Sequence, residues 1–365
     1  GIPLVPLMTV YDFFVKRALD QFFYNLYWKS SFICVGTPSG VTLSPEGAQH
    51  GWKSDIQIPN QITWEPFFCQ ELDWILCDTI KRIVTNNNTG RSGTMLRLVT
   101  RGAEQKDMLH YLKKQARFKS GLEGSLARSE FPLTGAMNEE EIATIDEAAI
   151  LRQIREQVLQ GAYYLIDYRG YAGYEPGDNV ISVFAMGSVT TEAIRASESL
   201  LAHGIYANVI VVTSPDLLIG IQGHESDYSY LKNDLGINSN LYLRKSEEVT
   251  SGDLITVAGK RVPVVSVHDG EPGLLDNIGS IIGVRQESCA VRKHSKSGRP
   301  SEIYAFHGID ADSVVQACGK VLSETALEQV MVRDRELEQT QSAGQAAHRH
   351  SWTELWPAKA PMNKH

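Results

Sequence analysis

The stretch Ser31-Phe-Ile-Cys-Val35, which runs directly into Gly36-Thr37-Pro38-Ser39-Gly40, decides the fold. An apolar run of this length that ends in a glycine-rich turn is typical of a buried strand. Pro66 to Val84 then predicts a helix, because proline favours a helix start and the apolar residues keep to one face. The run Thr94-Met-Leu-Arg-Leu-Val-Thr100 predicts the next strand. Strand, helix and strand in this order indicate a parallel sheet of the α/β class.

The alternation continues on both sides of this unit. Residues 11–27 predict a helix ahead of the first strand. A second α/β unit begins near residue 151. Its expected elements are a helix at 151–159, strands at 162–168, 179–185, 208–213 and 262–267, and helices at 191–203 and from Asp310 onward.

Residues 117–150 interrupt the alternation. They are rich in glycine and serine and then acidic, which indicates a linker or a surface excursion. Beyond residue 333 the apolar periodicity fails, which predicts a weakly ordered tail. The sequence therefore predicts two domains, at residues 1–116 and 151–332, with the linker between them and the tail at 333–365.

The composition is that of an ordinary globular chain of 365 residues, with a net charge of −8 that argues against a protein coating nucleic acid. Mean hydropathy is −0.20, and no apolar run approaches the roughly 20 residues that span a bilayer. Five scattered cysteines without a CxxC pair predict buried, reduced thiols and a cytoplasmic protein. The chain opens with Gly1 and has neither Met nor a signal peptide there, so we expect it to start within a domain.

Residues 36–50, the segment richest in polar side chains, directly follow the predicted strand at 31–35. In an open α/β sheet, ligands bind beyond the carboxyl ends of the strands. If the turn after Ser44 is helical, Glu46 and His50 lie four residues apart on one face, and the carboxylate favours a charged imidazolium. Such a pair is suited to holding a substrate carboxylate or giving up a proton. A surface pair without function has the same spacing, so the spacing alone leaves both interpretations open.

The order of the residues from 35 to 50 gives information beyond the spacing of Glu46 and His50. Val35-Gly-Thr-Pro-Ser-Gly-Val-Thr-Leu-Ser-Pro-Glu-Gly-Ala-Gln-His50, followed by Ile58-Pro59-Asn60 and the proline-led helix, resembles the homodimeric E1 component of bacterial pyruvate dehydrogenase. That component is a thiamine-diphosphate enzyme of the transketolase superfamily. Ala185-Met-Gly-Ser188 and Val212-Thr213-Ser214 are similar to the family's C-terminal domain. The resemblance covers roughly residues 5–325. It implies an α/β chain with a partial pyrimidine-binding parallel-sheet domain followed by a transketolase C-terminal-like domain.

The resemblance also implies a function and a site. The chain would be the C-terminal portion of a thiamine-diphosphate-dependent 2-oxoacid dehydrogenase E1, with pyruvate as the expected oxoacid. His50 matches a histidine that helps to place the oxoacid, and Glu46 matches its neighbouring carboxylate. Tyr11, Phe13 and Phe14 match the region where an aromatic ring packs on the cofactor's aminopyrimidine, with Phe14 preferred. The implied partners are a second copy of the chain or a separate N-terminal half, and the lipoyl domain of the E2 acyltransferase.

Departures from the family pattern limit what the chain would do by itself. The glycine–aspartate–glycine motif that binds diphosphate and Mg²⁺ is missing from these residues, and so is the glutamate that protonates the aminopyrimidine. We therefore expect Mg²⁺ to be held by residues outside this chain, with no metal site in it, and the chain alone to be incomplete as an enzyme. Two alternatives remain: a non-catalytic subunit from a truncated or split gene with an assembly or regulatory role, and another enzyme of the superfamily. The basic loop at 292–299 is either a solvated loop or a docking site for an acidic lipoyl domain.

Overall fold

A computed structural model describes residues 4–41, 58–85, 91–99, 101, 103–118, 146–169, 171, 173–235 and 262–342. Two compact units make up the chain, residues 1–325 and residues 326–365. Both sheets belong to the first unit. The predicted domain boundaries around residues 117–150 stay predictions, since most of that stretch lies outside the described residues.

The first sheet confirms the predicted parallel arrangement. Its four strands lie in the order β1-β2-β4-β3, and every neighbouring pair is parallel. The strands are β1 (Leu7–Val10), β2 (Phe32–Ser39), β3 (Gln61–Trp64) and β4 (Gly93–Val99). β2 extends past the predicted turn to Ser39, with a shift of register between Gly36 and Ser39. This irregularity lets the strand end carry polar side chains to the edge of the sheet.

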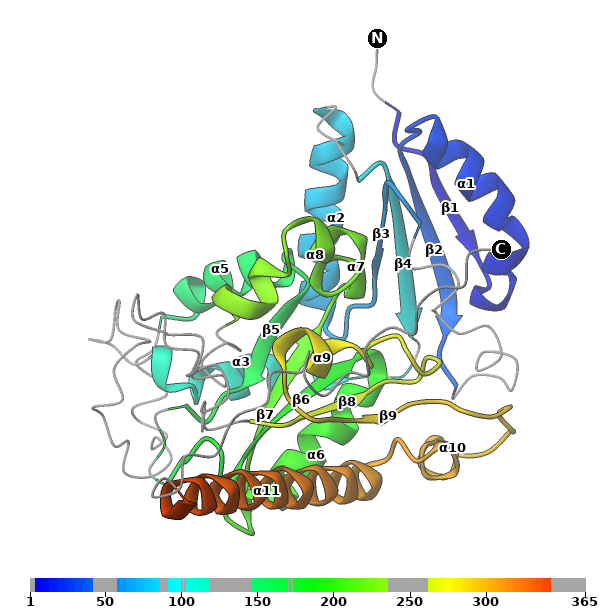
Figure 1. The fold of residues 1–365 in the computed structure, drawn as a ribbon. Coiled ribbons are helices and arrows are strands. Elements are labelled where there is room, and N and C mark those ends of the chain that lie inside the picture. The colour runs from blue at the N-terminus through cyan, green and yellow to red at the C-terminus, as the bar shows by residue number, and fades with distance from the viewer. Residues whose placement is uncertain are drawn as a thin grey trace, which may run out of the picture. The chain divides into compact units, whose positions relative to one another are not determined.

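Helices flank this sheet, as the sequence predicts, with small differences at their starts (Figure 1). The segment at 11–27 is a 3₁₀ helix (Asp12–Ala18) that continues into α1 (Leu19–Tyr27). The next helix, α2, spans Cys69–Val84 and begins three residues after Pro66. The reason is the Glu71 carboxylate, which accepts the backbone N–H groups of Phe67 and Phe68 at 2.6 and 3.1 Å and so fixes the first turn there.

The second sheet has five strands in the order β5-β7-β6-β8-β9. They are β5 (Ala162–Ile166), β6 (Val180–Met186), β7 (Tyr206–Val212), β8 (Val264–Val267) and β9 (Gln286–Cys289). β5 runs antiparallel to β7, and the other neighbours are parallel. The four strands predicted for this half are all present, and β9 is an edge strand that the sequence pattern does not reveal.

The helices of the second half are α3 (Lys106–Lys113), α5 (Glu147–Val158), α6 (Thr190–Leu201), α7 (Pro215–Leu218), α8 (Ile221–Glu225), α9 (Ile278–Ile282), α10 (Pro300–His307) and α11 (Ala311–Ser342), with short turns at Ala116–Phe118, Gly187–Val189 and Tyr230–Asp234. The helix predicted from Asp310 is α11, and it continues beyond residue 333 to Ser342. Among the described residues, no helix is both long and apolar enough to cross a membrane.

One apolar core serves both sheets. Ile33, Trp64 and Leu96 from the first sheet belong to the same buried cluster as Val183 and Val209 from the second. A separate cluster lies under α1, on the other face of the first sheet. Because the two sheets share a core, the ends of their strands are held in fixed relation within this unit. The free cysteines divide into three buried residues, Cys34, Cys289 and Cys318, and two exposed ones on α2, Cys69 and Cys77, where the sequence predicted burial for all five.

The shared core gives a first testable prediction. Leu96→Ala removes a side chain that is 1% exposed and should lower the free energy of unfolding by about 2–5 kcal/mol. Leu201→Ala, at the 39% exposed end of α6, is the control and should cost less than about 0.5 kcal/mol. Urea unfolding of both variants measures the difference, and equal losses would show that Leu96 does not belong to a packed core.

Candidate functional site at the strand ends

The carboxyl ends of strands from both sheets meet along a polar seam. The backbone N–H of Thr63 in β3 donates to Asp216 Oδ2 at 2.7 Å, and Ser214 Oγ donates to the carbonyl oxygen of Thr63 at 2.8 Å. Farther along the same strand end, Glu65 N donates to the carbonyl oxygen of Thr213 at 2.9 Å. Since buried backbone groups need partners, these hydrogen bonds fix β3 against the loop that follows β7.

A second crossing joins β2 to the end of β8. The backbone N–H of Val41 donates to Asp269 Oδ2 at 3.3 Å. Gly40 lies next to this contact with a φ of +96°, and a Cβ there would come within 2.5 Å of the same carboxylate oxygen. The close approach therefore requires glycine at position 40.

A buried ion pair lies at the ends of β1, β2 and β4. Arg97 in β4 donates from Nη1 to Asp12 Oδ1 at 2.5 Å, and Ser39 Oγ donates to Asp12 Oδ2 at 3.1 Å. The side chains of Arg97 and Asp12 are 1% and 4% exposed. Gly36 makes room for the pair, because a Cβ at that position would lie 2.8 Å from Asp12 Oδ1. A charged pair as dry as this one is stable only with both members present.

Glu65 is the unusual group of the site. It follows β3 directly, is fully buried, and neither of its carboxyl oxygens has a hydrogen-bond partner among the described residues. The carboxyl group lies against the backbone of Gly187, where a Cβ would fall 1.8 Å from Oε1. A buried carboxyl group without partners is costly in a folded chain, so its presence calls for a chemical reason.

Burial and neighbouring charges decide which of these groups are ionised. Burial, followed by the charge of Asp269, raises the pKa of Glu65 well above the usual carboxyl range, and Arg97 only partly offsets this. Burial also raises the pKa of Asp269, to about 6, although the Val41 N–H opposes the shift. We call Asp12, Glu65, Arg97 and Asp269 the strand-end site.

The strand-end site can therefore store and exchange protons. The raised pKa of Glu65 favours its neutral carboxylic acid form, which can donate a hydrogen bond. Asp269 titrates near neutral pH, which is where a general acid or base works best. Shifted carboxyl groups of this kind, gathered at the carboxyl ends of parallel strands, are typical of a binding or catalytic site.

A polar rim of four residues surrounds this site. The Arg101 guanidinium donates to Glu192 Oε1 at 3.3 Å and lies over the ring of Tyr304, 4.7 Å from its centre. The hydroxyl of Tyr304 is 2.8 Å from Ser188 Oγ, in the turn that follows β6. These contacts bring α6 and α10 to the same strand ends and supply one further cation there.

The residues that the sequence singled out are only partly described. Glu46 and His50 lie outside the described residues, and nothing is described of the Phe13 side chain. Tyr11 and Phe14 are close neighbours, with ring centres 5.7 Å apart in an edge-to-face arrangement, and Phe14 is 41% exposed. The roles assigned to these five residues stay predictions.

Sequence reasoning missed the four residues of the strand-end site. Each does leave a signal in the sequence: Arg97 is a charge within an apolar strand, and Glu65 ends another strand just before Pro66. Asp269 closely follows the apolar run at 262–267, and Asp12 stands within an aromatic turn. A charge after the carboxyl end of a predicted parallel strand is a rule that would have found Asp269. It would not have found Asp12 and Glu65, because they follow β1 and β3, which the sequence did not predict.

The described residues contain no group of three or more His, Cys, Asp or Glu side chains placed to hold a metal ion. The prediction that Mg²⁺ is bound by residues outside this chain stays a prediction.

Comparison with known proteins identifies the fold. No protein-family model and no curated sequence matches the chain. Among solved structures, transketolase from Leishmania mexicana matches with a TM-score of 0.53 and 15% identity, over 88% of this chain and 35% of its own. A transketolase mutant from Pichia stipitis matches with a TM-score of 0.52 and 13% identity, over 87% of this chain and 34% of its own. The chain thus has a transketolase-like α/β fold and spans about a third of the length of these transketolases.

The Glu65 environment predicts how stability depends on pH. A carboxyl group whose pKa is raised in the folded state favours folding at low pH, and this contribution is lost as the pH rises through the folded pKa. Glu65→Gln cannot ionise, so its free energy of unfolding should fall less than that of the wild type between about pH 5 and about pH 8. Urea unfolding at both pH values tests this. An unchanged pH slope would contradict the assignment of Glu65 as a buried, protonated acid.

The ion pair gives a matched set of variants. Arg97→Met leaves the Asp12 carboxylate buried without its guanidinium and should cost about 3–5 kcal/mol of stability. Adding Asp12→Asn removes the stranded charge and should restore a large part of that loss. The double variant is the control here: if it is no more stable than Arg97→Met alone, the pair is not coupled as the structure indicates.

Proposed function

We propose that this chain forms the pyrimidine-binding and C-terminal parts of a thiamine-diphosphate-dependent 2-oxoacid dehydrogenase E1, with pyruvate as the expected oxoacid. The observation that carries the proposal is the position of residues 35–39, the start of the stretch that resembles the family, at the end of β2. β2 ends at Ser39, whose hydroxyl donates to Asp12 of the strand-end site, so the part of the resembling stretch that lies in β2 ends next to that site. The transketolase-like fold supports the superfamily, and the sequence resemblance supports the choice of a 2-oxoacid enzyme within it.

The strand-end site fits the ring portion of the proposed cofactor. Glu65 is a buried acid with unused hydrogen-bonding capacity, which an aminopyrimidine nitrogen or amine would satisfy. Tyr11 and Phe14 offer rings at the end of β1, next to Asp12. The diphosphate end fits less well, because three of the four residues are carboxylic acids. We therefore propose that diphosphate and Mg²⁺ are held by residues outside this chain.

The chain's own residues would bind, orient and move protons. When bound, thiamine diphosphate would supply the electron sink that decarboxylation of a 2-oxoacid needs. Glu65 would donate a hydrogen bond from its protonated carboxyl group, and Asp269 would exchange a proton near neutral pH. His50, with Glu46 beside it, would orient the carboxylate of the oxoacid. The acyl group would then pass to the lipoyl group of the E2 acyltransferase.

An exposed aromatic surface on α1 supports the proposed homodimer or a separate N-terminal half. Four aromatic side chains of this helix and its end are between 49% and 77% exposed: Phe23, Tyr24, Tyr27 and Trp28. β1 beside it is an edge strand, with Leu7 61% exposed. Exposed aromatic patches of this kind are typical of protein–protein interfaces.

Replacing His50 tests the proposed function. In the complete assembly, His50→Ala should lower 2-oxoacid decarboxylation by about 10²-fold or more, because the substrate carboxylate loses its partner. His203→Ala, on the exposed end of α6, is the matched control and should keep full activity. Decarboxylation can be followed with an artificial electron acceptor, so that the E2 partner is not needed. Undiminished turnover in His50→Ala would overturn the assignment.

Cofactor binding separates the proposal from its alternative. The chain alone, titrated with thiamine diphosphate and Mg²⁺ in a calorimeter, should bind weakly, whereas the complete assembly should bind tightly. An assembly that does not bind the cofactor would favour the non-catalytic subunit instead.

A further inference from the structure

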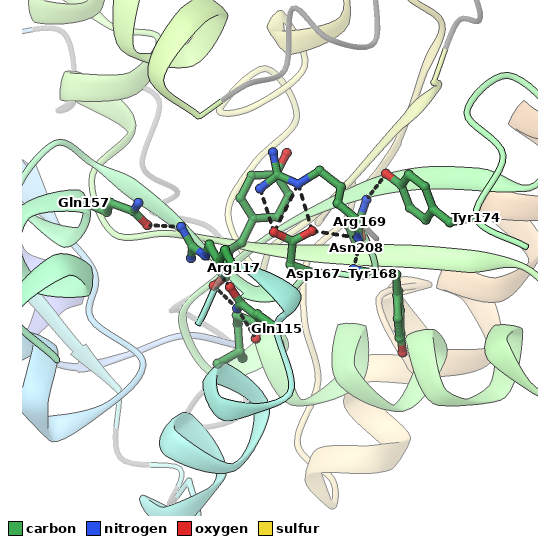
Figure 2. Close-up of polar contacts among 10 residues, drawn as sticks. Gln115, Arg117, Gln157, Asp167, Tyr168, Arg169, Tyr174 and Asn208 are labelled. Carbon is green, nitrogen blue, oxygen red and sulfur yellow. Dashed lines mark hydrogen bonds and ion pairs between the residues drawn. The ribbon is translucent and has the colours of Figure 1, made fainter. Parts of the chain in front are cut away.

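A second polar cluster lies at the carboxyl end of β5, at the opposite edge of the sheet from the strand-end site. β5 runs antiparallel to β7, so its carboxyl end lies at the amino ends of the neighbouring strands. Figure 2 shows Arg117, Gln115, Asp167 and Arg169 gathered there, with Gln157 to one side. Nothing in the proposed function uses this cluster.

Arg169 forms an ion pair with Asp167. Its Nε and Nη2 atoms donate to the two carboxylate oxygens at 2.8 and 2.6 Å, and its backbone N–H donates at 3.0 Å. The guanidinium also lies over the ring of Tyr164, 4.1 Å from the ring centre. This bidentate pair is therefore closed, and its carboxylate is engaged by Arg169 rather than by Arg117.

Arg117, in contrast, is held only by neutral groups. Its Nε donates to Gln115 Oε1 at 2.6 Å, and its Nη1 donates to Gln157 Oε1 at 3.3 Å. Gln115 is fixed in turn, because its amide N–H groups donate to the carbonyl oxygens of Tyr164 and Leu165 in β5. Arg117 Nη2 is buried and has no partner among the described residues. The guanidinium is thus oriented in advance, with one edge unused.

The cluster carries an excess positive charge. Two guanidinium groups face one carboxylate, and burial lowers the pKa of Arg117 to about 10, with further repulsion from Arg169 that Asp167 offsets. Arg117 shares the carboxylate of Asp167 with Arg169, and a buried cation with an incomplete counter-charge is costly to a folded protein. A neutral side chain at position 117 could make the same hydrogen bonds, since both hydrogen-bond acceptors of Arg117 are amide oxygens. An anion that joins the cluster would remove the imbalance.

A groove with a volume of about 380 Å³ lies beside the cluster. Gln157 belongs to both, because it lines the groove and accepts from Arg117. Tyr230 lines the same wall, where its hydroxyl donates to the carbonyl oxygen of Ala162 at 2.6 Å. Arg91 lines the groove as a second cation, near the carboxylates of Asp78 and Glu225. Arg117 does not itself line the groove, so a ligand would reach it only if the Gln157 amide turned aside.

We propose that this groove binds a small organic oxyanion, a carboxylate or a phosphate ester, which pairs with Arg117 and Arg91. Both guanidinium groups present N–H donors that match such oxygens. Gln157, Gln160 and Ser229 line the same groove and offer hydrogen bonds to the rest of the ligand. Glu156 and Asp234 on its exposed rim disfavour ligands of high negative charge. The site does not depend on the proposed function, since none of the four residues of the strand-end site lines this groove.

Calorimetric titration of the full chain tests the proposal, with acetate and inorganic phosphate as separate probes at constant ionic strength in sodium chloride. We expect saturable binding of at least one probe, and the stronger one tells whether the natural ligand is a carboxylate or a phosphate. Arg117→Gln and Arg91→Gln should each weaken binding by at least about tenfold. Arg152→Gln, on the exposed face of α5, is the control and should bind like the wild type.

Stability separates a binding role from a structural one. If Arg117 serves a ligand, Arg117→Gln without anion should be as stable as the wild type or more stable, because it removes an uncompensated charge. If Arg117 serves only to hold Gln115 and Gln157 in place, the same change should lower the free energy of unfolding. Anions should then not change the stability of the wild type or of Arg117→Gln. Should Arg117→Gln fail to fold, Arg91→Gln on the groove wall still tests the site. The absence of saturable binding of both probes to the wild type would overturn the proposal.

Discussion

The structure depends on one constraint: the strand ends of two sheets are buried against each other, and their backbone groups must still find partners. Carboxylates meet this need across the seam. Asp216 accepts from Thr63 and Asp269 accepts from Val41, so residues that follow strands of the second sheet supply acceptors for N–H groups of the first. An apolar seam would leave these donors unpaired at a cost of about 1–3 kcal/mol each. The chemistry of the strand-end site thus begins as a structural necessity.

Burial raises the pKa values of these carboxyl groups. The same dry surroundings that strengthen the Asp12–Arg97 pair raise the pKa values of Glu65 and Asp269, because each group has lost water and few hydrogen bonds replace it. Glu71 shows the same effect with more partners: it accepts from two backbone N–H groups and from the Tyr163 hydroxyl, and its pKa rises only to about 7. Burial is the largest cause of all three shifts, and hydrogen bonds from donors oppose it at Glu71 and Asp269.

Local patterns predicted the elements, and long-range pairing decided the site. The apolar runs of β2, β4, β6 and β7 are short and continuous, which is the pattern of strands buried on both faces, so the parallel sheets followed from the sequence. The start of α2 did not, because it depends on a side chain that turns back toward the helix end. Arg97 and Asp12 are 85 residues apart, and no periodicity links them. Glu46 and His50 rest on the resemblance alone.

The charges of the strand-end site indicate which kind of ligand it would bind. At the strand-end site Asp12 and Arg97 balance each other and a protonated Glu65 carries no charge, so Asp269 is the remaining acidic group. This favours a ligand ring that is cationic or rich in N–H donors and offers little attraction to a diphosphate. Thiamine diphosphate has both features, a cationic thiazolium ring and an anionic tail. A chain that binds the ring end at this site would need a basic or metal-bearing surface elsewhere for the tail. The division of the cofactor between this chain and a partner is therefore an electrostatic expectation, and it adds to the family resemblance that suggests thiamine diphosphate.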